Sequence, residues 1–82
     1  MKRLDLITSL LKGYNTACDI GSDHGYVLKY ALDNNYIKRG IVGEIAVGPL
    51  NNAKSNLNDY PVTFYLSDGF DKIKEKFDIG II

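Results

Sequence analysis

Apolar and polar residues along the 82-residue chain follow two patterns, one typical of short strands and one typical of helices. Four short runs rich in apolar residues predict β-strands. These runs are residues 16–20, 40–44, 62–66 and 78–82. The third run alternates most clearly, because Val62, Phe64 and Leu66 are separated by Thr63 and Tyr65.

Apolar residues at helical spacing lie ahead of the first run and between the others. The first predicted helix stops at Gly13, and the second follows Gly25 and ends near Asn34. A third opens at Gly48 and Pro49, with glycine at the cap and proline at the first helical position. A short fourth helix precedes the last strand. The four apolar stripes are Leu4, Ile7 and Leu11; Val27, Leu28, Ala31 and Leu32; Leu50, Ala53 and Leu57; and Phe70, Ile73 and Phe77.

Strands that alternate with helices over short connections predict an α/β fold with a parallel sheet and right-handed crossovers. We expect three layers, with helices flanking the sheet. The last strand carries Ile79, Ile81 and Ile82, and such an apolar strand belongs inside a sheet. Residues 1–82 are therefore expected to be the N-terminal part of a larger domain, truncated after the fourth strand. Self-association through the exposed edge of that strand is expected as well.

The charge and composition of the chain limit the classes of partner that it is expected to bind. Ten basic and ten acidic residues cancel, so no global charge favours nucleic acid or an anionic membrane. A single cysteine, Cys18, leaves no intrachain disulfide, and no apolar run reaches membrane-spanning length. We expect a cytoplasmic protein with no membrane partner and no metal.

The turn from Asp19 to Tyr26 is the strongest candidate site. It joins a buried strand to a helix, and Gly21 and Gly25 bracket it. A helix N-terminus offers free N–H groups, and glycine lets a ligand approach the backbone. This arrangement predicts a nucleotide-type site.

Two carboxylates in this turn distinguish between possible cofactors. A dinucleotide motif requires glycine two residues after Gly21, but Asp23 stands there and would repel a diphosphate. Asp19 adds a second negative charge. The pair suits a ligand with positive charge, such as the amino and sulfonium groups of S-adenosylmethionine. Alternatively, Asp23 only caps the following helix.

Acidic residues also follow the second and third strands. Glu44 lies 19 residues after Gly25, near the distance at which an acidic residue binds ribose hydroxyls in nucleotide-binding α/β units. Its alternative is an ordinary exposed charge. Asp68 could accept a hydrogen bond from an adenine amino group while Gly69 leaves room for the ring, or Asp68 could cap a helix.

These motifs resemble those of bacterial tRNA (adenine-22-N1) methyltransferases. The matching residues are Asp19 to Tyr26, Gly43-Glu44, Gly48-Pro49, Asp68-Gly69, Arg3-Leu4 and the closing strand from Asp78 to Ile82. The resemblance covers essentially the whole chain. It implies a Rossmann-like class I methyltransferase fold with strand order third, second, first, fourth. It also implies methyl transfer from S-adenosylmethionine to N1 of a tRNA adenine.

The resemblance also implies roles for individual residues. Those in the glycine turn would line the methionine end of the cofactor, Glu44 would bind the ribose and Asp68 the adenine. Arg3 would meet the cofactor carboxylate, with a solvated charge at the helix start as its alternative. His24 is either a site residue or a partly exposed polar residue. No catalytic residue is predicted. The full cofactor-binding set is Arg3, Asp19, Gly21, Ser22, Asp23, His24, Gly25, Glu44, Ile45, Asp68 and Gly69.

The chain departs from the family pattern in two places. Val27-Leu28 stands where the family usually has Leu-Pro, which alters packing. The family's motif facing the target adenine would begin after Ile82, and its coiled-coil-like tRNA-binding region also lies beyond the chain. We therefore expect the 82-residue chain alone to be inactive, with tRNA bound mostly by other regions. The alternatives are a NAD-dependent oxidoreductase and a non-catalytic adenosine-binding or interaction module.

Overall fold

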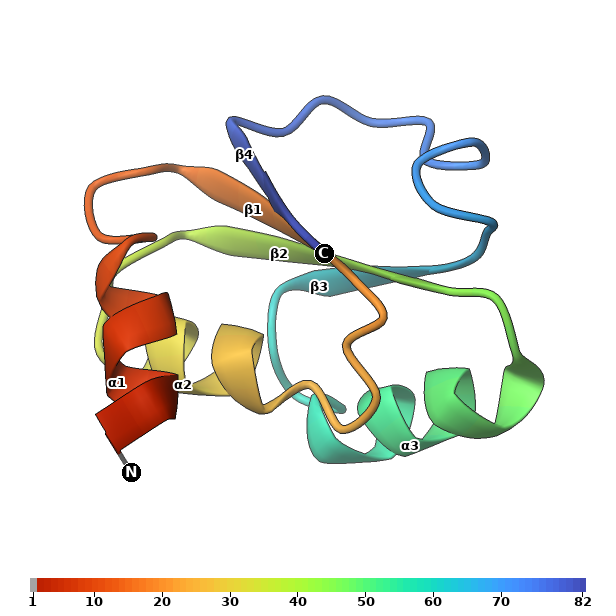
Figure 1. Ribbon diagram of the computed structural model, residues 1–82, viewed down its shortest axis with the longest axis horizontal. Helices are drawn as coiled ribbons and strands as arrows, with labels where there is room; N and C mark the ends of the chain where they lie inside the picture. Colours follow the sequence, from red (N-terminus) through yellow and green to blue (C-terminus); the bar gives the residue numbers. More distant parts are fainter. Residues whose placement is uncertain (1) are drawn as a thin grey trace.

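The computed structural model describes the backbone of residues 2–82 and the side chains of residues 6–82. Strands and helices alternate after a leading helix, as the sequence pattern predicts (Figure 1). The elements are α1 (Lys2–Ser9), β1 (Thr16–Ile20), α2 (Tyr26–Asp33), β2 (Arg39–Glu44), α3 (Val47–Asn56), β3 (Val62–Leu66) and β4 (Ile79–Ile81). None of the described helices is long and apolar enough to cross a membrane.

The four strands form one parallel sheet in the order β3-β2-β1-β4. In its register, Ile20 of β1 lies opposite Gly43 of β2, and Glu44 of β2 lies opposite Leu66 of β3. The predicted Rossmann-like order is thereby confirmed. The Asp78 carboxylate ties β4 to the start of β1, because its Oδ2 accepts the N–H groups of Asn15 at 3.2 Å and Thr16 at 2.9 Å.

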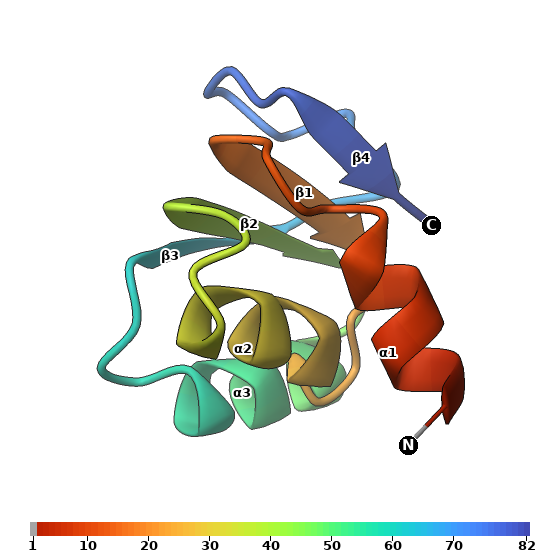
Figure 2. The same cartoon turned by 90° about the vertical axis from the view of Figure 1, so that its left-hand side faces the viewer.

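The hydrophobic core lies between the sheet and the helices, which all occupy one side of the sheet (Figures 1 and 2). Alternate residues of each strand point to this side, as Ala17 and Val42 do. Leu28 of α2 and Leu57 after α3 are fully buried there, and burial of each such side chain stabilises the fold by roughly 2 kcal/mol. The complete buried cluster is Leu11, Ala17, Leu28, Ala31, Ile37, Val42, Leu50, Ala53 and Leu57.

The prediction of a short helix around Phe70, Ile73 and Phe77 is wrong. Residues 67–78 instead form an irregular crossing segment over the face of the sheet opposite the helices. Ile73 reaches that face, since its Cδ1 lies 3.3 Å from the position a Cβ on Gly43 would occupy. Phe70 and Phe77 stack with ring centroids 5.3 Å apart, and both rings lie close to Gly80. The expected third layer is therefore irregular, because contacts with the sheet replace the helical hydrogen bonds of a segment too short to be stable as a helix alone.

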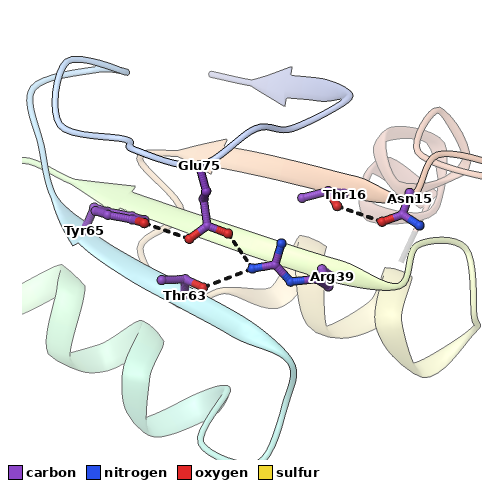
Figure 3. A network of polar contacts seen from close by, with 6 residues as sticks. All are labelled: Asn15, Thr16, Arg39, Thr63, Tyr65 and Glu75. Atoms are coloured by element: carbon purple, nitrogen blue, oxygen red, sulfur yellow. Dashed lines mark hydrogen bonds and ion pairs between the residues drawn. The ribbon is translucent and has the colours of Figure 1, made fainter.

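A polar network holds the crossing segment to the sheet (Figure 3). The carboxylate of Glu75 pairs with the Arg39 guanidinium from β2 and accepts the Tyr65 hydroxyl from β3 at 2.7 Å. Arg39 also donates to Thr63 Oγ1 at 3.3 Å. Arg39 and Gly43 are four residues apart on one strand, so Glu75 and Ile73 meet the same face of β2.

Two helix ends differ from prediction. α3 begins at Val47 after an N-cap at Ala46, so Pro49 is the third helical residue and Gly48 is not the cap. Proline is tolerated there because N–H groups of the first helical turn have no intrahelical partner. α1 ends at Ser9, and turns lead from there to Gly13, whose φ of 98° suits glycine.

Candidate functional site

The candidate site lies where β1, β2 and β3 end. The carboxyl ends of parallel strands meet at one edge of a sheet, where α/β proteins bind their ligands. Asp19 and Glu44 both face the helical side, since each stands two residues after a core residue of its strand. The register places these two strand ends side by side.

The glycines of the turn after β1 have different surroundings. Gly25, with φ of 75°, is the N-cap of α2 and lies against α3, because a Cβ there would stand 2.6 Å from Leu57 Cδ1. Gly21 also has φ of 75°, but no atom lies within 4 Å of its Cβ position. Gly25 thus allows the turn to pack against α3, whereas Gly21 leaves room for a ligand.

Asp23 does not cap a helix. α2 starts after Gly25, with no side-chain hydrogen bond at its cap. Asp23 is exposed with φ of 60°, and its backbone N–H donates to Glu44 Oε2. The capping alternative is therefore excluded. The backbone of the turn is instead held by the acidic residue at the end of β2.

Glu44 is not an ordinary exposed charge, because only 5% of the residue is accessible. One carboxylate oxygen accepts the Asp23 N–H. Its second oxygen has no hydrogen bond within the described residues and can accept another. The carboxylate is thus presented at the ligand-facing edge by a buried strand end.

Asp19 is also buried, with 6% of the residue exposed. Burial raises the pKa of its carboxyl to about 6, the neighbouring Ser22 hydroxyl opposes that rise, and the negative charge of Glu44 adds to it. Within residues 6–82 neither carboxylate forms an ion pair with a cation, and two buried carboxylates are costly unless a positively charged partner binds.

The Ser22 hydroxyl is a second group at this edge that could bind a polar ligand. Its oxygen is buried and finds no partner in good hydrogen-bond geometry within the described part of the chain, although it stands close enough to the Asp19 carboxylate to lower that pKa. Buried polar atoms in proteins are nearly always hydrogen-bonded, so an unpaired one points to a ligand or ordered water. Ser22 neighbours the Asp19 carboxylate and follows the open backbone at Gly21, which fits a polar, cationic ligand group.

The turn after β3 completes the edge. Gly69 has φ of 60°, and no atom lies within 4 Å of its Cβ position. The Asp68 side chain is exposed and makes no hydrogen bond or ion pair within residues 6–82. Its backbone carbonyl accepts the Asp71 N–H at 3.2 Å, so the residue begins a turn and no helix. The helix-cap alternative for Asp68 is excluded.

For three of the predicted site residues the structure gives fewer contacts with the rest of the site. The His24 ring is about half exposed, stacks on Tyr26 with centroids 5.2 Å apart, and has Nε2 3.5 Å from Asp23 Oδ2. Ile45 follows Glu44 and is 72% exposed at the ligand-facing edge. The side chain of Arg3 lies outside the described residues.

A separate hollow among the described residues lies away from this edge. It has a volume of about 400 Å³ and is found at the opposite, amino end of the strands. Its lining is Leu32, Asn35, Ile37, Lys38, Tyr60 and Pro61. No chemically reactive set lines it, so the strand-end carboxylates remain the candidate site. Within residues 6–82, no three acidic, histidine or cysteine side chains are grouped as a metal site would require.

Comparison with known proteins identifies the family of the chain. A family model described as a methyltransferase domain matches residues 1–82. The chain belongs to the methyltransferase domain family. The methyltransferase domain that the resemblance implied is therefore confirmed, as is the fold class.

Relatives of this methyltransferase domain include tRNA-modifying enzymes. The tRNA (adenine(22)-N(1))-methyltransferase of Bacillus subtilis is 33% identical over 78 residues, which are 90% of this chain and 33% of that protein. The crystal structure of the B. subtilis M1A22 tRNA methyltransferase TrmK matches with a TM-score of 0.85 at 33% identity, over 98% of this chain and 37% of that one. M. capricolum TrmK in complex with S-adenosyl-homocysteine matches with a TM-score of 0.83 at 30% identity, over 93% of this chain and 35% of that one. The domain thus spans about a third of the length of these relatives.

Some residues of the methyltransferase domain that support the site were not predicted. Ser67 is buried behind the Asp68–Gly69 turn, and Asn56 Nδ2 donates to the His24 carbonyl at 2.9 Å. Leu57 packs on Gly25. The sequence marked Leu57 only as a core residue, and nothing in the local pattern distinguishes Ser67 or Asn56 from ordinary polar residues.

Proposed function

We propose that the protein carrying this chain is an S-adenosylmethionine-dependent methyltransferase and that residues 1–82 supply the cofactor-binding half of its active site. The observation that carries the proposal is the pair of buried carboxylates, Asp19 and Glu44, beside the buried Ser22 hydroxyl and the open backbone at Gly21. Such a group is complementary to a ligand that has an amino cation and ribose hydroxyls. The similarity to M. capricolum TrmK, solved with S-adenosyl-homocysteine, supports it.

Each residue of the edge has a distinct task in this proposal. Asp19 and Ser22 accept hydrogen bonds from the cofactor amino group, and Gly21 lets the chain of the cofactor pass close to the backbone. The free oxygen of Glu44 accepts a ribose hydroxyl. Asp68 accepts the adenine 6-amino group, with Ile45 and Gly69 beside the ring.

The remaining predicted residues act at the methionine end. Asp23 and Gly25 shape the turn, His24 borders it, and Arg3 binds the cofactor carboxylate as a charged donor. S-adenosylmethionine, when bound, supplies a methyl group that is electrophilic because it is attached to positively charged sulfur. The residues named here bind and orient that cofactor, and the group that faces the methyl acceptor is proposed to lie outside residues 1–82.

We propose N1 of an adenine in tRNA as the methyl acceptor, on the basis of the B. subtilis relative. The tRNA is bound mostly by regions outside this chain, in the cytoplasm. The test is transfer of labelled methyl groups by the full-length protein to unmodified tRNA. The expected product is N1-methyladenine at a single position, and labelling of a different base or of protein alone would contradict the assignment.

Calorimetric titration with S-adenosylhomocysteine tests the cofactor site. Glu44→Gln should weaken binding by roughly tenfold or more, since a hydrogen bond to a charged group contributes about 1.5–3 kcal/mol. Asp33→Asn is the matched control, because Asp33 accepts the Tyr60 hydroxyl away from this edge. Its affinity should equal that of the wild type.

The same titration with NAD separates the proposal from an oxidoreductase. Asp19 and Glu44 crowd the edge with negative charge, so a diphosphate should bind poorly. We expect no measurable NAD binding at concentrations that saturate with S-adenosylhomocysteine. Tighter binding of NAD would overturn the proposed function.

A further inference from the structure

Ser67 is a buried residue that directly precedes the Asp68–Gly69 turn. Only 3% of the residue is accessible to solvent. Its hydroxyl donates to the Gly69 carbonyl at 2.8 Å and accepts the Lys72 N–H at 2.9 Å. Its backbone N–H donates to the Glu44 carbonyl at 2.7 Å. This one residue therefore joins the end of β2 to both sides of the turn.

The hydroxyl bonds determine the shape of the turn. A serine hydroxyl has one proton, and here that proton is directed at Gly69 while a lone pair faces Lys72. Gly69 has φ of 60°, which is one of several conformations open to glycine, so contacts such as these select it. Because the Asp68 carboxylate has no partner of its own in residues 6–82, its direction depends on the backbone that Ser67 holds.

We propose that Ser67 is a positioning residue for nucleobase recognition, which fixes the Asp68 carboxylate where it meets the 6-amino group of adenine. The inference rests on the proposed function, in which Asp68 contacts adenine. Ser67 itself touches no ligand. Its backbone bond to Glu44 also sets the spacing between the ribose-binding and adenine-binding carboxylates.

Ligand affinities should distinguish a serine that only stabilises the fold from one that positions Asp68. Loss of general stability weakens every ligand alike, whereas loss of the Asp68 direction weakens only ligands with the amino group. Two ligands separate these cases: S-adenosylhomocysteine and the otherwise identical purine analogue in which hydrogen replaces the 6-amino group. The preference for the first over the second measures the contact with Asp68.

The experiment measures both affinities by calorimetry on the full-length protein. Wild type should prefer S-adenosylhomocysteine by roughly tenfold, the usual scale for a hydrogen bond to a charged group. Ser67→Ala should reduce that preference to about twofold and leave the affinity for the purine analogue within about twofold of wild type. Asp68→Ala should abolish the preference, and adding Ser67→Ala to it should change the preference no further, since the two residues act as one unit.

The matched control is Tyr65→Phe, which removes a hydroxyl that also bonds to the crossing segment but ends on Glu75. It should keep the full preference even if its melting temperature falls as far as that of Ser67→Ala. If Ser67→Ala does not fold, Ser67→Cys replaces it, since a thiol is a weaker donor of similar size, and an intermediate preference is expected.

Equal weakening of both ligands by a folded Ser67 variant would overturn the inference and leave the proposed function standing. An unchanged preference in that variant would do the same. Failure of the wild type to bind S-adenosylhomocysteine would instead overturn the proposed function and the inference with it.

Discussion

Cofactor affinity should depend on the ionisation of the Asp19 carboxyl. Burial raises its pKa to about 6, so the group is largely neutral at pH 5 and charged at pH 7. A cationic amino group needs the charged form, so cofactor affinity should rise as the pH increases from 5 to 7. Calorimetric titrations across that range provide the measurement. Asp19→Asn should bind the cofactor more weakly at pH 7, and its affinity should no longer depend on pH. If the pH dependence persists in this variant, another group causes it.

The same residue should lower stability in the absence of ligand. Since the pKa of Asp19 is higher in the folded chain than the 3.8 of a free carboxyl, the folded state binds the proton more tightly. The favourable contribution is complete below pH 4 and is lost as the pH rises through 6, by an amount of about 2–3 kcal/mol. Asp19→Asn should therefore raise the melting temperature at pH 7 while it weakens cofactor binding. A lower melting temperature would show that the charge is compensated in the ligand-free fold.

At the scale of elements, the two glycines of the first turn should separate packing from binding. Gly25→Ala places a Cβ against Leu57 and strains a left-handed backbone, so it should destabilise the protein by about 2–4 kcal/mol. Gly21→Ala has the same backbone cost of about 1–2 kcal/mol but no clash. Chemical unfolding should show the larger loss for Gly25→Ala.

Binding should distinguish the pair as well. Gly21→Ala fills the open space beside Ser22 and should weaken S-adenosylhomocysteine binding in protein that remains folded. Equal stability losses for the two variants would contradict the assigned packing of Gly25 on Leu57. Unchanged affinity in Gly21→Ala would remove that glycine from the site.

The crossing segment should depend on Glu75. Burial raises the pKa of the Glu75 carboxyl, but hydrogen bonds with Tyr65, Arg39 and Thr63 outweigh burial and lower it overall. The contribution of Glu75 to stability is therefore present at neutral pH and is lost as the pH falls through that pKa. Its partner Arg39 is nearly half exposed, so Glu75→Gln should cost only about 1 kcal/mol in global stability. Locally the effect should be larger, with trypsin cutting faster at Lys72, Lys74 and Lys76. Tyr60→Phe, which removes a hydroxyl bond to Asp33, is the control and should leave cleavage unchanged.

For the whole molecule, we propose that residues 1–82 depend on further sequence for catalysis, because the chain spans about a third of its relatives. The isolated chain should bind S-adenosylhomocysteine weakly at best and transfer no methyl group to tRNA. Its β4 edge has no neighbouring strand in the described sheet, so the isolated chain should self-associate at high concentration. Sedimentation and a methyl-transfer assay check both points. Robust turnover by the isolated chain would place the catalytic group among the residues assigned here to the cofactor.

Local sequence patterns determined the strands and the acidic residues at their ends. Strand periodicity and buried stripes depend on neighbours a few residues away, and parallel strands bring their carboxyl ends together whatever the loops do. The amino-acid sequence alone therefore suffices to place Asp19, Glu44 and the Asp68–Gly69 pair at one edge. The order of the strands followed from family resemblance, since periodicity alone does not specify it.

Only the tertiary structure decided how that edge is held. The apolar spacing of Phe70, Ile73 and Phe77 suits a helix, but the segment is irregular and packs on Gly43 of the distant strand β2 and on Gly80 of the following strand β4. The bond from the Asp23 N–H to Glu44 and the packing of Gly25 on Leu57 join residues more than twenty positions apart. The role of Ser67 has the same origin. Such contacts form only when the chain has folded, because they join groups that the local sequence pattern does not bring together.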